Sequence, residues 1–185
     1  VAMLGDSTFF RSGITSLIEV LYNNSRVVSL ILDNRITGMT GHQENPGSGR
    51  HADLSAAPAI DIEALVRALG AKHVRTVNPN DLAAMGEALD CGLALDGPSV
   101  IITRWPCALK RLSQADLTEF PGAFQSKYAV DEGKCIGCRL CLKAGCPALS
   151  VDQERKKAAI SLQQCLGCGI CGQICPNEAI VKEDK

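Results

Sequence analysis

The stretch that decides the fold reads CIGCRLCLKAGCP over residues 135–147, and a second copy, CLGCGICGQICP, follows at residues 165–176. Each copy has three cysteines separated by two residues and a fourth cysteine that precedes a proline. Short loops of this kind aim successive thiolates at one point, so the pattern is typical of [4Fe–4S] clusters, with the fourth cysteine reaching the other cluster. The repetition indicates a duplicated cluster-binding unit.

The spacing divides the eight cysteines of the repeat into two ligand sets. One cluster would take Cys135, Cys138, Cys141 and Cys175, and the other would take Cys165, Cys168, Cys171 and Cys146. A structural zinc site is the alternative, but it leaves the middle cysteine of each triplet without a role. The tight spacing also disfavours the disulfides of a secreted module. The first copy has four residues before its last cysteine, where the usual pattern has three, and we expect Gly145 to absorb the extra residue.

Residues 127–185 are therefore predicted to form a small α+β ferredoxin domain of the bacterial type. Between the two copies, residues 148–152 and 157–162 flank a charged turn and predict a β-hairpin. Cys91 and Cys107 lie outside the repeat. We interpret them as small buried hydrophobic side chains without chemistry of their own.

The part of the chain before the repeat alternates between predicted strands and helices. Apolar runs at residues 1–4 and 27–32 are typical of buried strands, and an amphipathic stretch at residues 10–22 lies between them. After a long loop, we expect a helix capped by Asp61, a strand at residues 73–77, a helix that starts at Asn78-Pro79, and a strand at residues 99–103. This alternation predicts an α/β domain with a parallel sheet over residues 1–104, followed by a linker at residues 105–126.

Composition and charge disfavour several classes of protein. The formal net charge is −1 and the basic residues are scattered, so we expect no nucleic-acid partner. The most apolar stretch, residues 17–32, is too short and too polar to span a membrane, so we expect no membrane partner. Cluster-binding cysteines favour the reducing cytoplasm. The chain opens on Val1 inside an apolar run, and we interpret it as part of a longer polypeptide.

Polar residues follow the first two predicted strands. Gly5-Asp6-Ser7 lies where a strand gives way to a helix, so glycine permits a tight turn and the following amides can bind an anion. Asn34 ends the next strand, 28 residues after Asp6, which is close to the length of one βαβ unit. The two side chains should meet at the carboxyl edge of the sheet, where oxygen ligands can hold Mg²⁺ against a diphosphate.

The same residues resemble a known family. The segments GDS at residues 5–7 and LDN at residues 32–34 resemble the diphosphate motif of thiamine-diphosphate enzymes. The loop MTGHQ at residues 39–43 resembles that of the 2-oxoacid:ferredoxin oxidoreductases, and the alpha subunits of the indolepyruvate type are the most similar branch. The resemblance extends from Gly5 to Pro176 and includes the four-residue spacing before Cys146. Ser7 departs from the general motif, which has a glycine there.

The resemblance implies a role for each matched residue. Mg²⁺ would be bound by the side chains of Asp6 and Asn34 and by the carbonyl of Ile36. The diphosphate would lie against Gly5, Ser7 and Thr8, and the thiazolium would lie near Met39, Thr40 and His42. His42 is the candidate catalytic residue, because a histidine there can bind a substrate carboxylate or move a proton. A purely structural role, in which His42 fixes the loop by hydrogen bonds, is the alternative.

The resemblance also implies a reaction. Thiamine diphosphate would serve the oxidative decarboxylation of an aryl 2-oxo acid, coenzyme A would take the acyl group, and the clusters would pass electrons to ferredoxin. Such enzymes contain a pyrimidine-binding domain, which these 185 residues lack, and a beta subunit, so we expect an oligomer and no turnover by this chain alone. Two alternatives stay open: an electron carrier without thiamine chemistry, and an enzyme for pyruvate or branched 2-oxo acids.

Overall fold

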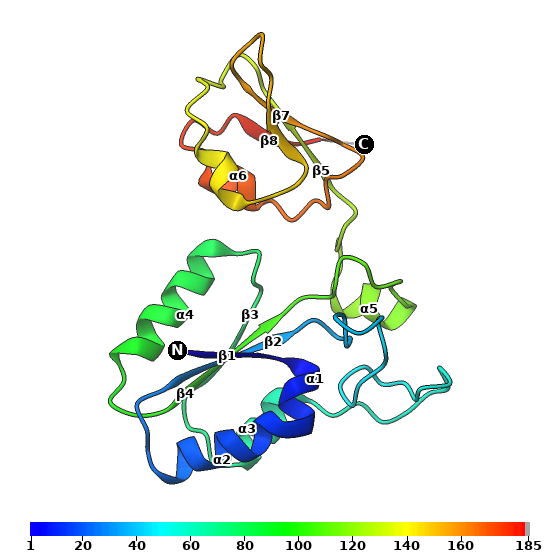
Figure 1. Cartoon of the computed structure of the whole chain (residues 1–185), viewed down its shortest axis with the longest axis vertical. Coiled ribbons are helices and arrows are strands. Elements are labelled where there is room, and N and C mark those ends of the chain that lie inside the picture. The colour runs from blue at the N-terminus through cyan, green and yellow to red at the C-terminus, as the bar shows by residue number, and fades with distance from the viewer. Residues whose placement is uncertain (184–185) are drawn as a thin grey trace. The chain divides into compact units, whose positions relative to one another are not determined.

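The computed structural model describes residues 1–183 and divides the chain into two compact units (Figure 1). The first unit is Val1–Leu112, and the second begins at Ser113. The predicted domain limits, residue 104 for the first domain and residue 127 for the second, stay a prediction. Each unit is described separately below.

A parallel four-stranded sheet forms the centre of the first unit. It consists of β1 (Ala2–Gly5), β2 (Val28–Asp33), β4 (Ser99–Arg104) and β3 (Val74–Val77), in that spatial order. The continuous apolar runs of β2 and β4 are buried because they lie in the middle of the sheet and are covered on both faces. Since every neighbouring pair is parallel, the carboxyl ends of all strands meet at one edge. The predicted parallel sheet is confirmed.

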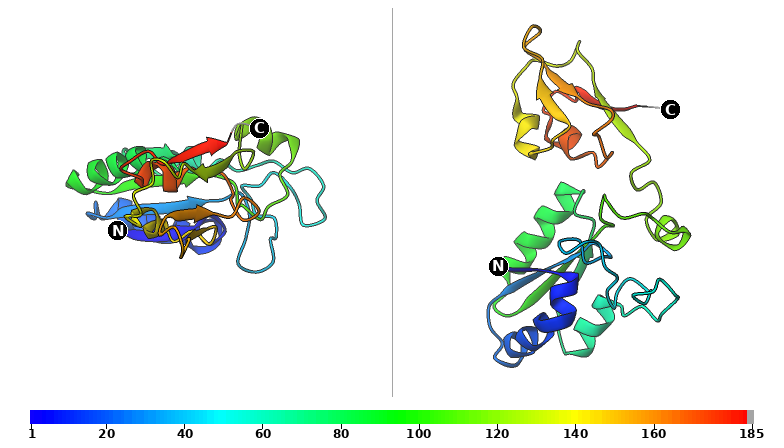
Figure 2. Two further views of the ribbon diagram at one scale, coloured as in Figure 1. Left: turned by 90° about the horizontal axis from the view of Figure 1, so that it is seen from above. Right: turned by 45° about the vertical axis from the view of Figure 1, so that its right-hand side comes forward.

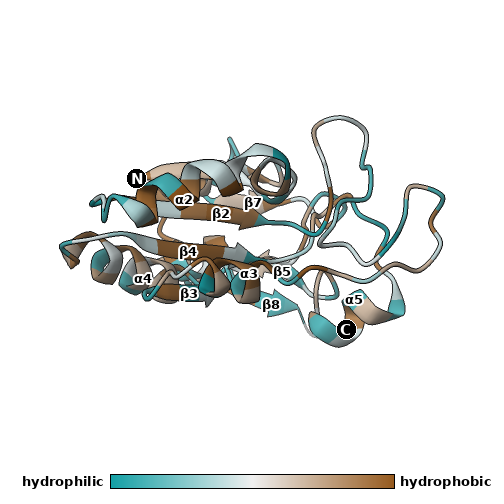
Figure 3. Ribbon diagram, turned by 90° about the horizontal axis from the view of Figure 1, so that it is seen from below, coloured by the Kyte–Doolittle hydropathy of each residue, from teal (hydrophilic) through white to brown (hydrophobic). Residues whose placement is uncertain are grey.

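Helices cover both faces of this sheet (Figures 2 and 3). One face packs on a continuous helical run made of α1 (Asp6–Thr8), the π-helix η1 (Phe9–Gly13) and α2 (Ile14–Tyr22), together with α3 (Ile62–Ala68). The other face packs on α4 (Leu82–Ala94). The run starts at Asp6, earlier than the periodicity predicted, because the first turn carries polar residues that show no apolar stripe. No helix within residues 1–183 is both long and apolar enough to cross a membrane.

The helix caps agree with the sequence at one position and differ at another. Asp61 caps α3 as predicted, since its Oδ1 accepts a hydrogen bond from the Ala64 amide at 2.7 Å. The prediction that Asn78 caps α4 is wrong. Asn78 closes a local turn by accepting from the Asn80 amide at 2.9 Å, and Asp81 caps the helix instead. Both asparagine and aspartate favour such positions, so the sequence does not distinguish the turn from the cap.

The segment predicted to be a linker contains a short helix, α5 (Gln114–Glu119). A capping box between Ser113 and Asp116 stabilises its first turn. Six residues are too few to show a helical periodicity, which is why the sequence did not indicate this helix.

After α5, the described part of the second unit consists of two antiparallel strand pairs and two short helical segments. The strand β5 (Lys127–Val130) pairs with β8 (Ile180–Glu183), and β6 (Leu149–Val151) pairs with β7 (Ala158–Ile160), which confirms the predicted hairpin. The 3₁₀-helix η2 (Leu140–Ala144) and α6 (Ile170–Ile174) complete it. Its core is built around Cys141, Cys171 and Ile180. This arrangement agrees with the predicted ferredoxin-like α+β domain.

Candidate functional site

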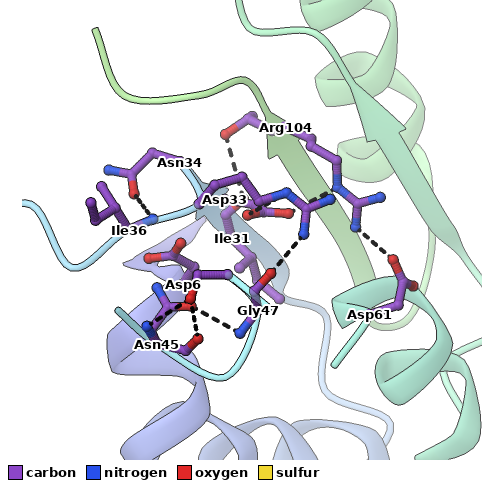
Figure 4. Close-up of polar contacts among 12 residues, drawn as sticks. Asp6, Ile31, Asp33, Asn34, Ile36, Asn45, Gly47, Asp61 and Arg104 are labelled. Atoms are coloured by element: carbon purple, nitrogen blue, oxygen red, sulfur yellow. Dashed lines mark hydrogen bonds and ion pairs between the residues drawn. The ribbon is translucent and has the colours of Figure 1, made fainter. Parts of the chain in front are cut away.

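Asp6 lies at the carboxyl edge of the sheet, in the first turn after β1 (Figure 4). Its side chain is only 3% exposed, and Oδ1 accepts a hydrogen bond from the Ser7 amide at 2.6 Å, whereas Oδ2 is buried without a hydrogen-bond partner. Burial raises the pKa of Asp6 above its ordinary value, although the Asn45 side chain and the Ser7 amide act in the opposite direction. A buried carboxylate oxygen without a partner is costly, and a bound cation would remove that cost.

Asn34 and Ile36 are close to Asp6, as Figure 4 shows. Asn34 directly follows β2, and its Oδ1 accepts a hydrogen bond from the Ile36 amide at 3.1 Å. The Ile36 amide also lies near enough to Asp6 to lower the pKa of that carboxyl, against the larger effect of burial. The structure therefore brings together the three residues that the sequence predicted as Mg²⁺ ligands. The donor set of carboxylate, side-chain amide and backbone carbonyl oxygens fits Mg²⁺.

The turn at Gly5 differs from the prediction in its conformation. Gly5 has a φ of −74° and a ψ of 159°, which any residue can adopt, so the turn itself does not require glycine. No atom lies within 4 Å of the place that a Cβ would occupy, which leaves space for a ligand against the backbone. The Ser7 amide already donates to Asp6, so Ser7 offers a diphosphate mainly its hydroxyl group.

The loop residues Met39, Thr40 and His42 lie at the surface, whereas Asp6 is buried. Met39 is 98% exposed, and Thr40 and His42 are also exposed. A backbone bridge between Thr37 and Gln43 closes the loop, and His42 has a φ of 63°. The loop is thus a tight projection from the sheet edge, and the predicted roles of its three residues stay predictions.

A buried ion-pair network lies at the same edge and was not predicted. Arg104, at the end of β4, donates from Nε to Asp33 at 2.8 Å and from Nη2 to Asp61 at 3.1 Å. Arg35 lies 3.8 Å from Asp33 on its other side. The register of the sheet pairs Asp33 with Arg104, so the signal was a pair of opposite charges at the ends of two adjacent strands. The network holds the end of β2 that carries Asn34.

The first cysteine set lines a small, largely apolar pocket in the second unit. All four predicted members line it: Cys135, Cys138, Cys141 and Cys175. Burial raises the pKa of Cys141, and the other three cysteines raise it further, which shows that the thiols lie close together. The Ala179 amide donates a hydrogen bond to the Cys175 Sγ at 3.3 Å, as amides near cluster ligands do.

The second set is assembled in the same way. The pKa of Cys171 is raised to about 11, mainly by burial and also by the nearby thiols of Cys168, Cys165 and Cys146. Cys146 joins this set despite its longer spacing, because η2 ends at Ala144 and the following Gly145, with a φ of 62°, turns the chain back. Each set thus combines three cysteines of one copy with the fourth of the other, and their assignment as cluster ligands stays a proposal.

The remaining histidine, cysteine and acidic side chains form no further metal site in the described part of the chain, and the two cysteines outside the repeat differ in burial. Within residues 1–183, no three histidine, cysteine or acidic side chains are arranged to hold a single metal ion. Cys91 is exposed, so its interpretation as a buried side chain is wrong, and Cys107 is partly buried. Cys91 lies on the outer face of α4, near Arg75.

Comparisons with known families and proteins agree with the division of the chain into two units. Residues 1–103 match the C-terminal TPP binding domain of thiamine pyrophosphate enzymes, and residues 118–179 match the 4Fe-4S dicluster domain. The chain is 42% identical over 183 residues to the indolepyruvate oxidoreductase subunit IorA of Pyrococcus horikoshii, and 42% identical over 181 residues to that of Archaeoglobus fulgidus. The alignments cover 98% and 97% of the chain but 28% of each relative.

Among solved structures, 2-oxoglutarate:ferredoxin oxidoreductase from Magnetococcus marinus is similar in fold. The TM-score is 0.54 at 17% sequence identity, over 62% of this chain and 42% of that one. At this level of identity the similarity concerns the fold alone.

Proposed function

The chain belongs to the thiamine pyrophosphate enzymes, and from this premise we propose that it takes part in the oxidative decarboxylation of a 2-oxo acid coupled to electron transfer. Its cofactors are thiamine diphosphate and [4Fe–4S] clusters. The observation that carries the proposal is the buried Asp6 carboxylate, whose Oδ2 has no partner at the carboxyl edge of the sheet. That edge is where parallel α/β domains bind their ligands.

Each part of the chain has a proposed task. Asp6, Asn34 and the carbonyl of Ile36 would hold Mg²⁺, and Ser7 and Thr8 would hold the diphosphate beside Gly5. Bound thiamine diphosphate supplies an electron sink for decarboxylation, and bound clusters accept electrons singly. On the motif match alone, Met39, Thr40 and His42 are proposed to contact the reactive end of the cofactor. The two cysteine sets are proposed as the cluster ligands.

The substrate and partners are proposed from the relatives. Because the relatives are indolepyruvate oxidoreductase subunits, we propose an aryl 2-oxo acid of the indolepyruvate type as the substrate. Coenzyme A, an external ferredoxin and a beta subunit are the proposed partners in an oligomeric enzyme. Ten free cysteines favour a reducing compartment, and we propose the cytoplasm. A bare electron carrier would have no use for an unpaired buried carboxylate at Asp6.

The metal and cofactor site can be tested by calorimetry. Thiamine diphosphate is titrated with Mg²⁺ into the complete enzyme that contains this chain, and into its Asp6→Ala variant. We expect a loss of at least about 100-fold in affinity, because a charged metal ligand is removed. An unchanged affinity would refute the assignment of Asp6.

The clusters can be tested by reconstitution with iron and sulfide. We expect about eight irons per chain and about half that number in the Cys175→Ala variant, since one cluster loses a ligand. Cys91→Ala is the matched control, because Cys91 is exposed and outside both sets, and it should keep the full iron content. Tight binding of about two zinc ions, without iron–sulfur absorption, would contradict the cluster assignment.

A further inference from the structure

Asn45 lies beside Asp6, although the two residues are far apart in sequence (Figure 4). The side chain comes from the loop between β2 and α3 and is 94% buried, since its exposed fraction is 6%. Its Nδ2 is a buried donor without a hydrogen-bond partner. No sequence motif marked this residue, and the tasks proposed above do not use it.

The orientation of the Asn45 amide is determined by its neighbours. The Gly47 amide donates to Oδ1 at 2.9 Å, and an N–H group can only donate to the oxygen end of the side chain. The NH₂ end is therefore the free end. It cannot exchange places with Oδ1 without breaking this bond and placing two donors against each other.

The turn that carries Asn45 is held at several points. The Ser48 hydroxyl and the Ser48 amide both donate to the Asn45 carbonyl, at 2.8 and 2.9 Å. Arg35 donates to the Gly47 carbonyl at 3.1 Å, which ties the turn to the end of β2. Asn45 is thus presented by a preorganised turn, so its unpaired donor is a stable feature of the site.

A buried acceptor and a buried donor, each without a hydrogen-bond partner, thus lie close together in the site. Asp6 Oδ2 is an acceptor that a cation would satisfy, and Asn45 Nδ2 is a donor that an acceptor oxygen would satisfy. The Asn45 side chain lies close enough to Asp6 to lower the pKa of that carboxyl, but neither Asp6 Oδ2 nor Asn45 Nδ2 has a partner at full hydrogen-bond distance and angle. A metal-bound diphosphate offers both missing partners at once, because the metal binds the carboxylate and the phosphate oxygens accept from the amide.

We propose that Asn45 is a binding residue of this site that donates a hydrogen bond from Nδ2 to an oxygen of the metal-bound diphosphate. The inference rests on the proposed function and adds a protein contact to the diphosphate from outside the Gly5–Thr8 turn. It also separates the roles of two amides: Asn34 acts through its oxygen toward the metal, and Asn45 acts through its nitrogen toward the anion.

The experiment measures binding of thiamine diphosphate at saturating Mg²⁺ to the complete enzyme, by calorimetry, with inorganic pyrophosphate and Mg²⁺ as a second probe. Asn45→Ala should weaken both probes by about 10-fold or more, as expected for a hydrogen bond to a charged group. Asn45→Asp should weaken them by about 100-fold, because it replaces the donor by a negative charge beside Asp6. Ser48→Ala is the matched control, since it loosens the turn but keeps the donor, and it should change affinity by less than about 3-fold.

The outcomes separate this inference from the function on which it rests. If the unaltered enzyme binds neither probe, the proposed function fails and the inference fails with it. If the enzyme binds but Asn45→Ala binds equally well, only the inference is overturned. Binding by Asn45→Asp at or above the original affinity would assign Asn45 to the metal and also overturn the donor role. An equal loss in Ser48→Ala and Asn45→Ala would attribute the effect to the order of the turn. Thermal unfolding of each variant identifies misfolding, and Asn45→Asp, which keeps the shape of the side chain, then decides.

Discussion

Replacing Arg104 by methionine should destabilise the first unit strongly. Methionine keeps most of the apolar stem of arginine but removes the guanidinium that contacts Asp33 at 2.8 Å and Asp61 at 3.1 Å. The Asp33 side chain is only 1% exposed and that of Arg104 is 17% exposed, so this pair lies in a largely water-free place. After the substitution, the Asp33 carboxylate stays buried without its closest positive partner.

The magnitude follows from these contacts. Removing one partner of a buried ion pair costs about 3–5 kcal/mol. Arg35, at 3.8 Å from Asp33, still supplies some positive charge and reduces the loss. The Asp61 contact adds less than about 1 kcal/mol, because the Asp61 carboxylate is half exposed. We therefore expect a loss of about 3 kcal/mol in the free energy of unfolding.

Urea denaturation monitored by tryptophan fluorescence suits this test. The chain has a single tryptophan, Trp105, which lies in the first unit and reports its unfolding without the second. With a urea dependence of about 1–3 kcal/mol per M, the midpoint should fall by roughly 1–3 M. Asp33→Asn in the Arg104→Met background should cost much less than the sum of the single changes, because the unpaired charge is gone.

Arg75→Met provides the matched control. Arg75 forms an ion pair with Glu87 at 2.8 Å, but both side chains are exposed, so the loss should stay below about 1 kcal/mol. Similar losses of unfolding free energy in the two arginine variants, or no coupling between Arg104 and Asp33, would contradict the idea that burial makes this ion-pair network strongly stabilising.

Two further predictions concern a helix cap and a cysteine loop. Burial raises the pKa of Asp61, but the Ala64 amide and Arg104 lower it, so the net pKa lies below its ordinary value. The charge of Asp61 therefore stabilises the fold above about pH 4, and this contribution is lost as the pH falls through the lowered folded-state pKa. Asp61→Asn keeps a cap and should cost under about 1 kcal/mol at neutral pH and almost nothing near pH 3, as measured by urea denaturation; a larger cost in acid would contradict this sign. Gly167→Ala should lower the free energy of unfolding of the reconstituted protein, measured by thermal denaturation, by more than about 2 kcal/mol. Gly167 has a left-handed backbone conformation, and the added Cβ would lie 2.1 Å from the Ser126 carbonyl oxygen. Gly86→Ala, in an open position on α4, should instead stabilise by about 0.5–1 kcal/mol, and the same sign for both glycines would refute the argument.

The sheet was predictable because its central strands are buried on both faces. The apolar run at residues 27–32 became β2, Val28–Asp33, with a shift of one residue, and that at residues 99–103 became β4, Ser99–Arg104. A parallel sheet follows from strands that alternate with helices, so the meeting of Asp6 and Asn34 at one edge could also be inferred. The local hydrophobic pattern was therefore sufficient to predict the elements whose residues are buried in the sheet.

The parts that were missed depend on pairing or on loop geometry. The contact of Arg104 with Asp33 requires the register between β2 and β4, which the sequence does not encode locally. Asn45 lies in a long loop whose path is determined by bonds such as that from Arg35 to the Gly47 carbonyl. The exposed position of Met39 follows from the bridge between Thr37 and Gln43, which no periodicity indicates. Motif and spacing therefore indicate candidate ligands at strand ends but not candidates carried by the loops between them.

The cysteine sets were predictable for a different reason. The spacing rule assigns the fourth cysteine of each copy to the cluster of the other copy, so it predicts a contact between residues far apart in sequence. Neither copy of the motif can complete its own set, because each fourth cysteine belongs to the other copy. Cys141 lies in η2 and Cys175 directly follows α6, so their contact depends on the packing of these two helical segments against each other. Both sets thus form only when the whole unit has folded. The extra residue before Cys146 is tolerated because Gly145, at a φ of 62°, reverses the chain outside the sets and leaves the cysteine in its place.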